Sequence, residues 1–175
     1  SRAYVNNGGD IALYLSQGTS LSTAIKGHGG TDLGRIEIDA SDQIGGIATS
    51  GRLGRSHSFG IAESVTVLAP SAAAADVAAT LIANAVDLPG HPAITRRAAC
   101  DMDEASDLGD LPVVTGCDPL SAAECTRALD AGKRRADDFQ RQGLINMAAL
   151  FLQGHVATSP FYLLTPSKEP IHVQA

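Results

Sequence analysis

Long apolar runs are absent from this chain of 175 residues, although 44% of it is hydrophobic. No stretch reaches the roughly 18 apolar residues that a membrane-spanning helix needs, so no membrane segment is predicted. Long basic runs are absent as well: the formal net charge is −6, and Lys133-Arg134-Arg135 is followed closely by Asp137-Asp138. We therefore expect no nucleic-acid-binding surface.

The chain also has few cysteines and no Cys-x-x-Cys pair. Cys100, Cys117 and Cys125 are odd in number and widely spaced. This pattern indicates structural or incidental thiols in a reducing cytoplasm, rather than a disulfide framework.

The sequence begins at Ser1 with neither an initiator Met nor a charged-then-apolar leader. Because the segment around Tyr4-Val5-Asn6 already has a strand-like pattern, we expect that the native protein has a further N-terminal segment. The length and an 18% content of charged residues predict that residues 1–175 form one globular domain. The composition leaves open whether the chain forms a homo-oligomer.

The stretch from Gly45 to Thr80 is the densest in chemical groups. Ser64 to Leu68 predicts a buried strand, Pro70 ends it, and Ser71 can cap an alanine-rich helix. On that helix Asp76 and Thr80 are four residues apart, so a carboxylate and a hydroxyl share one face. Two hard oxygens suit Mg²⁺ or Ca²⁺. The alternative is that Asp76 is a solvated helix residue and that Thr80 bonds back to its own backbone.

Residues 49–57, Thr-Ser-Gly-Arg-Leu-Gly-Arg-Ser-His, have the composition of an anion site. Glycines let backbone N–H groups approach a ligand, hydroxyls can donate, and Arg52 and Arg55 can hold phosphate oxygens. The segment matches no phosphate-loop consensus, since it lacks the final Lys-Ser/Thr. The alternative is an ordinary surface loop whose arginines pair with acids.

Further strands are predicted from alternation and turn residues. Residues 10–15 and 23–26 lie on either side of residues 16–20, a five-residue connection with glycine, which indicates a hairpin and an antiparallel sheet. Residues 35–39 alternate strictly, residues 46–49 form a short strand, and the loop before residue 35 holds His28, which we interpret as a loop histidine.

Two helices and further strands are predicted from residue 71 onward. The first helix spans residues 71–86, with Val77, Leu81, Ile82 and Ala85 as its apolar side. Ser121 begins a second helix that ends near Gln142. Strands are expected at residues 112–115 and 144–155, although the length of the second segment also permits a helix. Residues 96–111 form a solvated acidic connector.

Five short motifs occur in a characteristic order. They are Asn7-Gly8-Gly9-Asp10-Ile11, Thr49-Ser50-Gly51, His57, the strand at 64–68, and Ala75-Asp76-Val77-Ala78-Ala79-Thr80. The series resembles the ApbE-like superfamily, whose best-known members are flavin transferases that use FAD and a divalent metal to attach FMN to a Thr or Ser of a protein. The resemblance covers about residues 3–85, and the remainder is similar to an uncharacterised branch found in bacteria and archaea.

This resemblance implies an α+β fold, in which T-fold-like antiparallel sheets carry two main helices. It implies that Asp76 and Thr80 hold Mg²⁺, that Gly8, Gly9, Asp10, Thr49, Ser50, Gly51, Arg52 and Arg55 contact FAD, and that His57 takes a catalytic part. A flavin nucleotide and an acceptor protein would then be the partners.

The sequence departs from the family pattern after His57. The family's His-x-x-Asp-Pro-x-Thr-Gly segment is replaced by Ser58-Phe59-Gly60-Ile61-Ala62. A second hypothesis is therefore a binding module or divergent enzyme that uses the same loop for another phosphorylated or carboxylated small molecule.

Overall fold

A six-stranded antiparallel sheet forms the centre of the computed structural model, which describes residues 1–26 and 32–159. The strand order is β1-β2-β5-β6-β9-β10. Its central strand β6 is buried along its whole length, as its β-branched and apolar sequence predicts. The strands are β1 (Arg2–Asn7), β2 (Asp10–Leu15), β5 (Gly46–Ser50), β6 (Ser64–Ala69), β9 (Met147–Leu152) and β10 (His155–Ser159).

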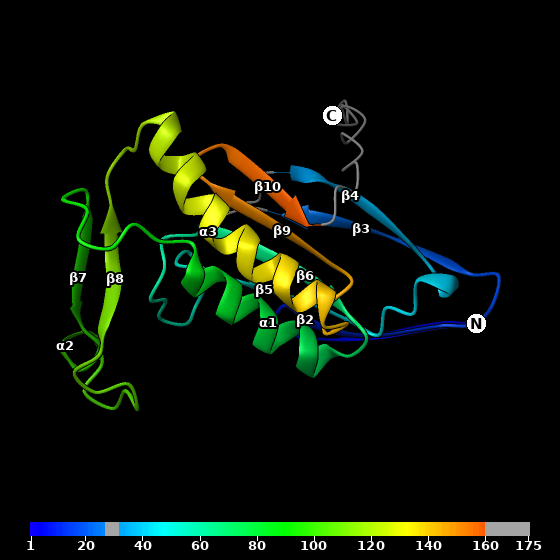
Figure 1. The fold of residues 1–175 in the computed structure, drawn as a ribbon. Helices are drawn as coiled ribbons and strands as arrows, with labels where there is room; N and C mark the ends of the chain where they lie inside the picture. Colours follow the sequence, from blue (N-terminus) through cyan, green and yellow to red (C-terminus); the bar gives the residue numbers. More distant parts are fainter. Residues whose placement is uncertain (27–31, 160–175) are drawn as a thin grey trace, which may run out of the picture.

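Two helices, α1 (Ala72–Ala85) and α3 (Ala122–Arg141), lie side by side against one face of this sheet (Figure 1). Both predicted caps are confirmed. The Ser71 hydroxyl accepts a hydrogen bond from the backbone N–H of Ala74, and Ser121 forms a reciprocal capping box with Glu124.

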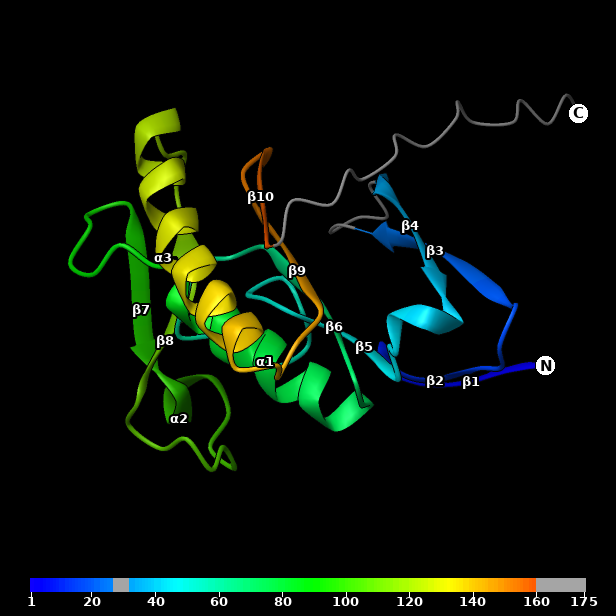
Figure 2. The ribbon, with the colours of Figure 1, turned by 45° about the vertical axis from the view of Figure 1, so that its right-hand side comes forward.

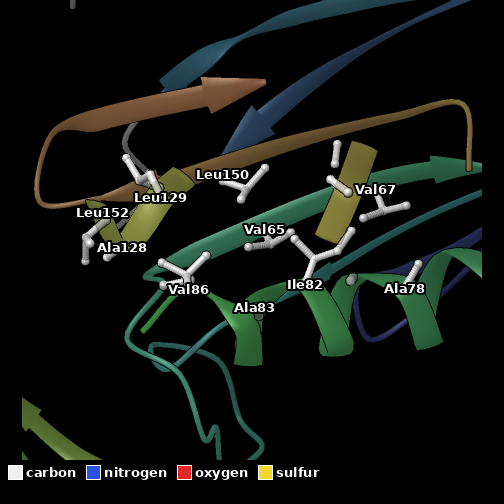
Figure 3. Packing of buried hydrophobic residues seen from close by; sticks show 14 of the residues in the cluster. Val65, Val67, Ala78, Ile82, Ala83, Val86, Ala128, Leu129, Leu150 and Leu152 are labelled. Carbon is white, nitrogen blue, oxygen red and sulfur yellow. The ribbon is translucent and has the colours of Figure 1, made fainter. Parts of the chain in front are cut away.

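The main core lies between these helices and the sheet. Figure 3 shows Val65 and Val67 of β6 and Leu150 and Leu152 of β9 facing side chains of α1 and α3. Each large apolar side chain buried in this way contributes about 1.5–3 kcal/mol of transfer free energy. Residues of the two helices and of the α1 C-cap in this core include Ala78, Ile82, Ala83, Val86, Ala128 and Leu129.

The side of α1 that faces the sheet differs from the predicted one. Ile82 is buried, but Val77 and Leu81 are 58% and 44% exposed, and alanines take their places. The reason is the close approach of the helix to β5. A Cβ on Gly46 would lie 2.2 Å from the backbone nitrogen of Ala72, so only small side chains fit between the two backbones.

The opposite face of the sheet is covered by the antiparallel pair β3 (Ser20–Lys26) and β4 (Asp32–Asp39), as Figure 2 shows. A second apolar cluster fills this layer and includes Ile25, Ile38, Ile47 and Leu68. The predicted pairing of residues 10–15 with residues 23–26 is wrong, because β2 pairs with β1 and β5 while β3 pairs with β4. A short 3-10 helix, η2 (Ala40–Asp42), follows β4. His28 lies outside the described residues.

A separate ribbon of two strands, β7 (Ile94–Ala98) and β8 (Pro112–Cys117), stands at one end of the sheet (Figure 1). The helix α2 (Ala99–Met102) lies between them, so the region expected to be a connector includes regular structure. The segment 144–155 holds β9 and the turn into β10. The predicted α+β class is confirmed, and within residues 1–26 and 32–159 no helix is long and apolar enough to cross a bilayer.

Candidate functional site

The turn between β1 and β2 places Gly8 and Gly9 beside Arg55. Both glycines have positive φ values, +68° and +116°, as a two-residue hairpin turn requires. The guanidinium Nη2 of Arg55 donates a hydrogen bond of 2.7 Å to the carbonyl oxygen of Gly8. A Cβ at Gly8 would lie 2.3 Å from that Nη2 atom, so glycine at this position makes the contact possible.

Asp10, directly after this turn, is electrostatically coupled to the helix. Its pKa is raised, first by partial burial and next by the negative charge of Asp76, while the positive charge of Arg55 lowers it. Asp10 and Asp76 therefore lie close enough to repel one another. The fold brings together residues that are 66 positions apart in the sequence.

Asp76 belongs to a polar stripe along α1. Asp76, Thr80 and Asn84 follow one another at four-residue intervals and so share one side of the helix. Asn84 uses its side-chain oxygen to accept hydrogen bonds from the backbone N–H of Phe59, at 3.0 Å, and from the hydroxyl of Ser58, at 3.3 Å. The stripe thus runs from the β1–β2 turn to the segment that follows His57.

The carboxylate of Asp76 and the hydroxyl of Thr80 are exposed, and neither forms a hydrogen bond or ion pair with the part of the chain that the structure describes. On α3, by contrast, the hydroxyl of Thr126 donates to the carbonyl oxygen of Ala122. The backbone bond considered as an alternative for Thr80 is therefore not formed. We refer to Gly8, Gly9, Asp10, Arg55, Asp76 and Thr80 as the hairpin–helix site.

Arg52 has different partners from Arg55. Its Nη2 lies 3.4 Å from Oε1 of Glu63, its backbone N–H donates to Ala62, and its side chain is 17% exposed. Glu63 also accepts from the backbone N–H of Gln153, so Arg52 belongs to a network with the β9–β10 turn. The alternative in which an arginine of this loop pairs with an acid thus holds for Arg52. Gly51 (φ +150°) packs against the backbone of Glu63.

Thr49 and Ser50 point to opposite faces of the sheet because successive side chains alternate along a strand. Ala48 belongs to the core beneath α1, whereas Ile47 belongs to the cluster on the other face. Thr49 therefore faces away from α1, where its hydroxyl lies 2.9 Å from that of Thr66. Ser50 shares the face that carries the hairpin–helix site.

His57 is exposed, but the residues that follow it are part of the fold. Ser58 and Ile61 are buried, and the hydroxyl of Ser58 donates to the carbonyl oxygen of Gly60. A Cβ on Gly60 would lie 2.1 Å from the carbonyl oxygen of Ala83. Residues 58–62 thus fasten the loop to α1.

The oxygen atoms of the hairpin–helix site are of the chemical type that binds hard cations such as Mg²⁺. Two carboxylates and one hydroxyl are available, and a divalent cation between Asp10 and Asp76 would remove their repulsion. In residues 1–26 and 32–159 no group of three or more His, Cys, Asp or Glu side chains is arranged to hold a metal. The remaining ligands would be waters or phosphate oxygens, as is usual for Mg²⁺.

The residues of the site are exposed, apart from Asp10, which is half-buried. Two pockets, of about 140 Å³ and about 520 Å³, lie elsewhere, around Met147 and around Thr19. Sequence reasoning selected both parts of the hairpin–helix site but missed the contact between Arg55 and Gly8 and the role of Asn84. No local pattern distinguishes Arg55 from Arg52; only the paired glycines at 8 and 9 mark a place where another side chain can approach.

Comparison with known proteins gives a family and similar proteins from two archaeal genera. The model of the family described as AbpE bacteria matches residues 1–158. A UPF0280 protein of Methanopyrus kandleri is 34% identical over 117 residues, which cover 61% of this chain and 43% of the relative. A UPF0280 protein of Methanoculleus marisnigri is 38% identical over 112 residues, which cover 62% of this chain and 39% of the relative.

The matched region therefore spans about two fifths of the length of these curated relatives. No solved structure matches. Because the family match extends over most of the sequence, the chain belongs to the family described as AbpE bacteria.

Proposed function

We propose that this member of the AbpE bacteria family is ApbE-like and binds Mg²⁺ together with the pyrophosphate of a flavin nucleotide, FAD, at the hairpin–helix site. The observations that support the proposal are the hydrogen bond from Arg55 to the carbonyl oxygen of Gly8, two residues before Asp10, and the effect of the Asp76 and Arg55 charges on the pKa of Asp10. Carboxylates beside a guanidinium supply ligands for a cation and a donor for phosphate oxygens in one place.

Each residue has a role in this proposal. Asp76 and Thr80, with Asp10, would hold Mg²⁺, which when bound supplies neutralisation of pyrophosphate charge. Arg55 would hold a phosphate oxygen, with the backbone N–H groups of the Gly8-Gly9 turn close to the nucleotide. Arg52 is committed to Glu63, so we assign it to loop support instead of phosphate binding.

The reaction proposed is transfer of FMN from FAD to a Thr or Ser hydroxyl of an acceptor protein. The hydroxyl oxygen bonds to the phosphorus of the FMN half, the bond from that phosphorus to the bridging oxygen breaks, and AMP leaves. The hydroxyl proton must pass to a base, for which exposed His57 is the candidate. Arg55 would place a positive charge beside the phosphate, where negative charge develops on the oxygens in the transition state.

The test is incubation of the protein with FAD, Mg²⁺ and a threonine-containing acceptor protein. Covalent FMN on the acceptor and an equal amount of released AMP are expected. Asp76→Asn should reduce the rate at least tenfold, about 1.4 kcal/mol in activation free energy. Asp130→Asn, the same change of charge on α3, is the matched control and should leave the rate unchanged. Absence of both products would refute the transferase.

One observation favours a second candidate, a nucleotide-binding protein without transfer activity. Ser58, Gly60 and Ile61 are buried and fasten the loop to α1, where the transferases carry their Asp-Pro-x-Thr-Gly segment. In that case FAD or another phosphorylated or carboxylated ligand at a hundredfold its Kd would raise the free energy of unfolding by about 2.7 kcal/mol. Stabilisation by FAD without AMP release would select this candidate over the transferase.

A further inference from the structure

Strand β1 is the least covered strand of the six-stranded sheet. It stands at one edge, and all six of its residues are exposed, including Tyr4 at 66% and Val5 at 69%. In Figure 2 the ribbon of β1 and β2 extends past α1 toward the N-terminus. The strand at the other edge, β10, contacts α3, and its last residue Ser159 is buried and donates a hydrogen bond to Asp137. Within residues 1–26 and 32–159 no strand pairs with the outer side of β1.

Strand β1 also lacks the features that normally keep an edge strand from pairing. Such edges are blunted by proline, by β-bulges or by charged side chains. β1 contains no proline, pairs with β2 without a register shift, and has its one charged residue, Arg2, at its start. The pairs β3–β4 and β7–β8, by contrast, each contain a register shift. The outer side of β1 is therefore a template on which another extended strand can pair.

The hydrogen bonds of β2 determine which backbone groups of β1 point to the free edge. The backbone N–H of Leu13 donates a hydrogen bond of 2.9 Å to the carbonyl oxygen of Gly45, on the side of β2 away from β1. Leu13 is opposite Tyr4, so these two residues form a non-hydrogen-bonded pair, and the N–H and C=O of Tyr4 point outward. Because the pattern alternates along the strand, Arg2 and Asn6 also present their backbone groups to the free edge.

The two faces of β1 carry different side chains. Tyr4 lies on the face that β3 and β4 cover, because its opposite residue Leu13 belongs to the apolar cluster of that layer. Its neighbours Ala3 and Val5 lie on the other face, which carries α1. Tyr14 of β2 is opposite Ala3 and is 62% exposed. The ribbon of β1 and β2 therefore has uncovered apolar side chains on the face of α1.

We propose that β1 pairs with β1 of a second copy of this chain, antiparallel and about a two-fold axis at Tyr4. Residues whose backbone groups point outward must then lie opposite one another. An axis at Tyr4 uses all of them: Tyr4 is opposite its own copy, and Arg2 is opposite Asn6 of the second copy, so no like charges meet. Ala3 is opposite Val5 of the second copy on the face of α1. The two six-stranded sheets become one continuous sheet.

The exposed apolar residues favour a second copy as the occupant of this edge. In the proposed register, Tyr14 and Ala3 of one copy continue into Val5 and Ala12 of the other, and the two-fold axis repeats this row. The contact follows one strand of about 20 Å, which is small beside the roughly 800 Å² that each partner buries in a standard interface. We therefore expect reversible association that depends on protein concentration. The proposal is independent of the flavin site, because β1 ends before Gly8.

The test is sedimentation equilibrium of the full 175-residue chain at protein concentrations from about 10 µM to about 1 mM. The mean mass should rise with concentration from 18.0 kDa toward twice that mass. Tyr4→Lys should weaken association roughly tenfold or more, because it sets two ammonium groups opposite one another. Val156→Lys changes a 52% exposed residue of the other edge strand, β10, and should leave association unchanged. A mass of 18.0 kDa throughout, or equal effects of the two substitutions, would overturn the proposal.

A mixture of oppositely charged variants tests the register. Tyr4→Glu alone should also remain monomeric, because two carboxylates then lie opposite one another. Mixed in equal amounts with Tyr4→Lys, it should form dimers again, because an ammonium group then faces a carboxylate on the axis. Thermal unfolding of each variant alone checks that the fold is retained. If the mixture remains monomeric while wild type associates, the axis does not lie at Tyr4 and the proposed pairing is wrong.

Discussion

The two helices that share one face of the sheet differ in how many of their polar side chains have partners. On α3, Glu124 bonds to Ser121 and His91, Lys133 forms an ion pair with Asp137, and Asp137 accepts from buried Ser159. On α1, Asp76 and Thr80 have no such partner in the part of the chain described. Polar groups that a helix does not use for its own stability remain available for a ligand.

The helices also differ in how they contact the sheet. Helix α1 packs through alanines against β5 and β6, and the glycine at position 46 allows the two backbones to approach closely. Helix α3 adds Cys125 and Leu129 to the core but carries charged residues along its outer side. We expect α1 to be sensitive to added volume and α3 to lost polar contacts.

The largest effect should come from adding volume under α1. In Gly46→Ala the new methyl group would lie 2.2 Å from the Ala72 backbone nitrogen, and no side-chain rotation can relieve a clash with backbone. We expect the free energy of unfolding to fall by about 3 kcal/mol, measured by urea denaturation. Gly116→Ala is the control, because its Cβ would lie 3.5 Å from the nearest atom, the Cβ of Thr95. Equal stability of the two variants would contradict the close approach.

The tight approach of α1 also shows what the sequence could and could not predict. The caps Ser71 and Ser121, the strand at 64–68 and the α+β class are local signals and were predicted correctly. The buried side of α1 was not, because large residues such as Val77 normally mark a core and here face outward. Burial of the alanines depends on a glycine 26 positions before Ala72, which helix periodicity does not contain.

The partner of the strand at residues 10–15 was predicted wrongly for a similar reason. Residues 10–15 and 20–26 both form strands, and the four-residue link between them has the length of a hairpin loop. The register is set instead by the Gly8-Gly9 turn and by the apolar layer that β3 and β4 bury. The candidate site could be predicted as two separate motifs, whereas the proximity of Asp10 and Asp76 follows only from the sheet order.

The second prediction compares the helix caps. Ser121→Ala removes a hydroxyl that bonds to both the backbone and the side chain of Glu124, whereas Ser71→Ala removes one bond to a backbone N–H. We expect a loss of about 1–2 kcal/mol for Ser121→Ala and about 0.5–1 kcal/mol for Ser71→Ala. Urea denaturation at pH 7 measures both. A larger loss for Ser71→Ala would contradict the view that α3 depends more on its polar contacts.

The third prediction uses the pH dependence of the same cap. Hydrogen bonds from the Ser121 hydroxyl and backbone, then that of His91, lower the pKa of Glu124 from 4.5 to about 2. A lowered pKa stabilises the fold above pH 4.5, and this contribution is lost as the pH falls toward 2. Stability curves of wild type and Glu124→Gln should therefore differ most above pH 5 and converge in strong acid. A constant difference at all pH values would contradict this assignment.

The smallest effect on stability, and the most informative about function, is expected for Asp76→Asn. The pKa of Asp10 is raised by burial and by the Asp76 charge, so the stability that Asp10 contributes is complete below its ordinary pKa of 3.8 and is lost as the pH rises through the raised value. Removing the Asp76 charge relieves this repulsion. Without metal, the variant should equal or exceed wild type by up to about 0.5 kcal/mol at pH 7, with no gain at pH 3.

Added Mg²⁺ should make wild type more stable than Asp76→Asn, the reverse of the order expected without metal. At a hundredfold the Kd, Mg²⁺ adds about 2.7 kcal/mol to a protein that binds it only when folded, and the variant lacks the ligand. Thermal unfolding with and without MgCl₂ at pH 7 measures the reversal, with Asp130→Asn on α3 as the charge-matched control. If Mg²⁺ stabilises Asp76→Asn as much as wild type, α1 does not hold the cation. If the metal-free variant unfolds several kcal/mol more easily, Asp76 supports the fold as the acids of α3 do.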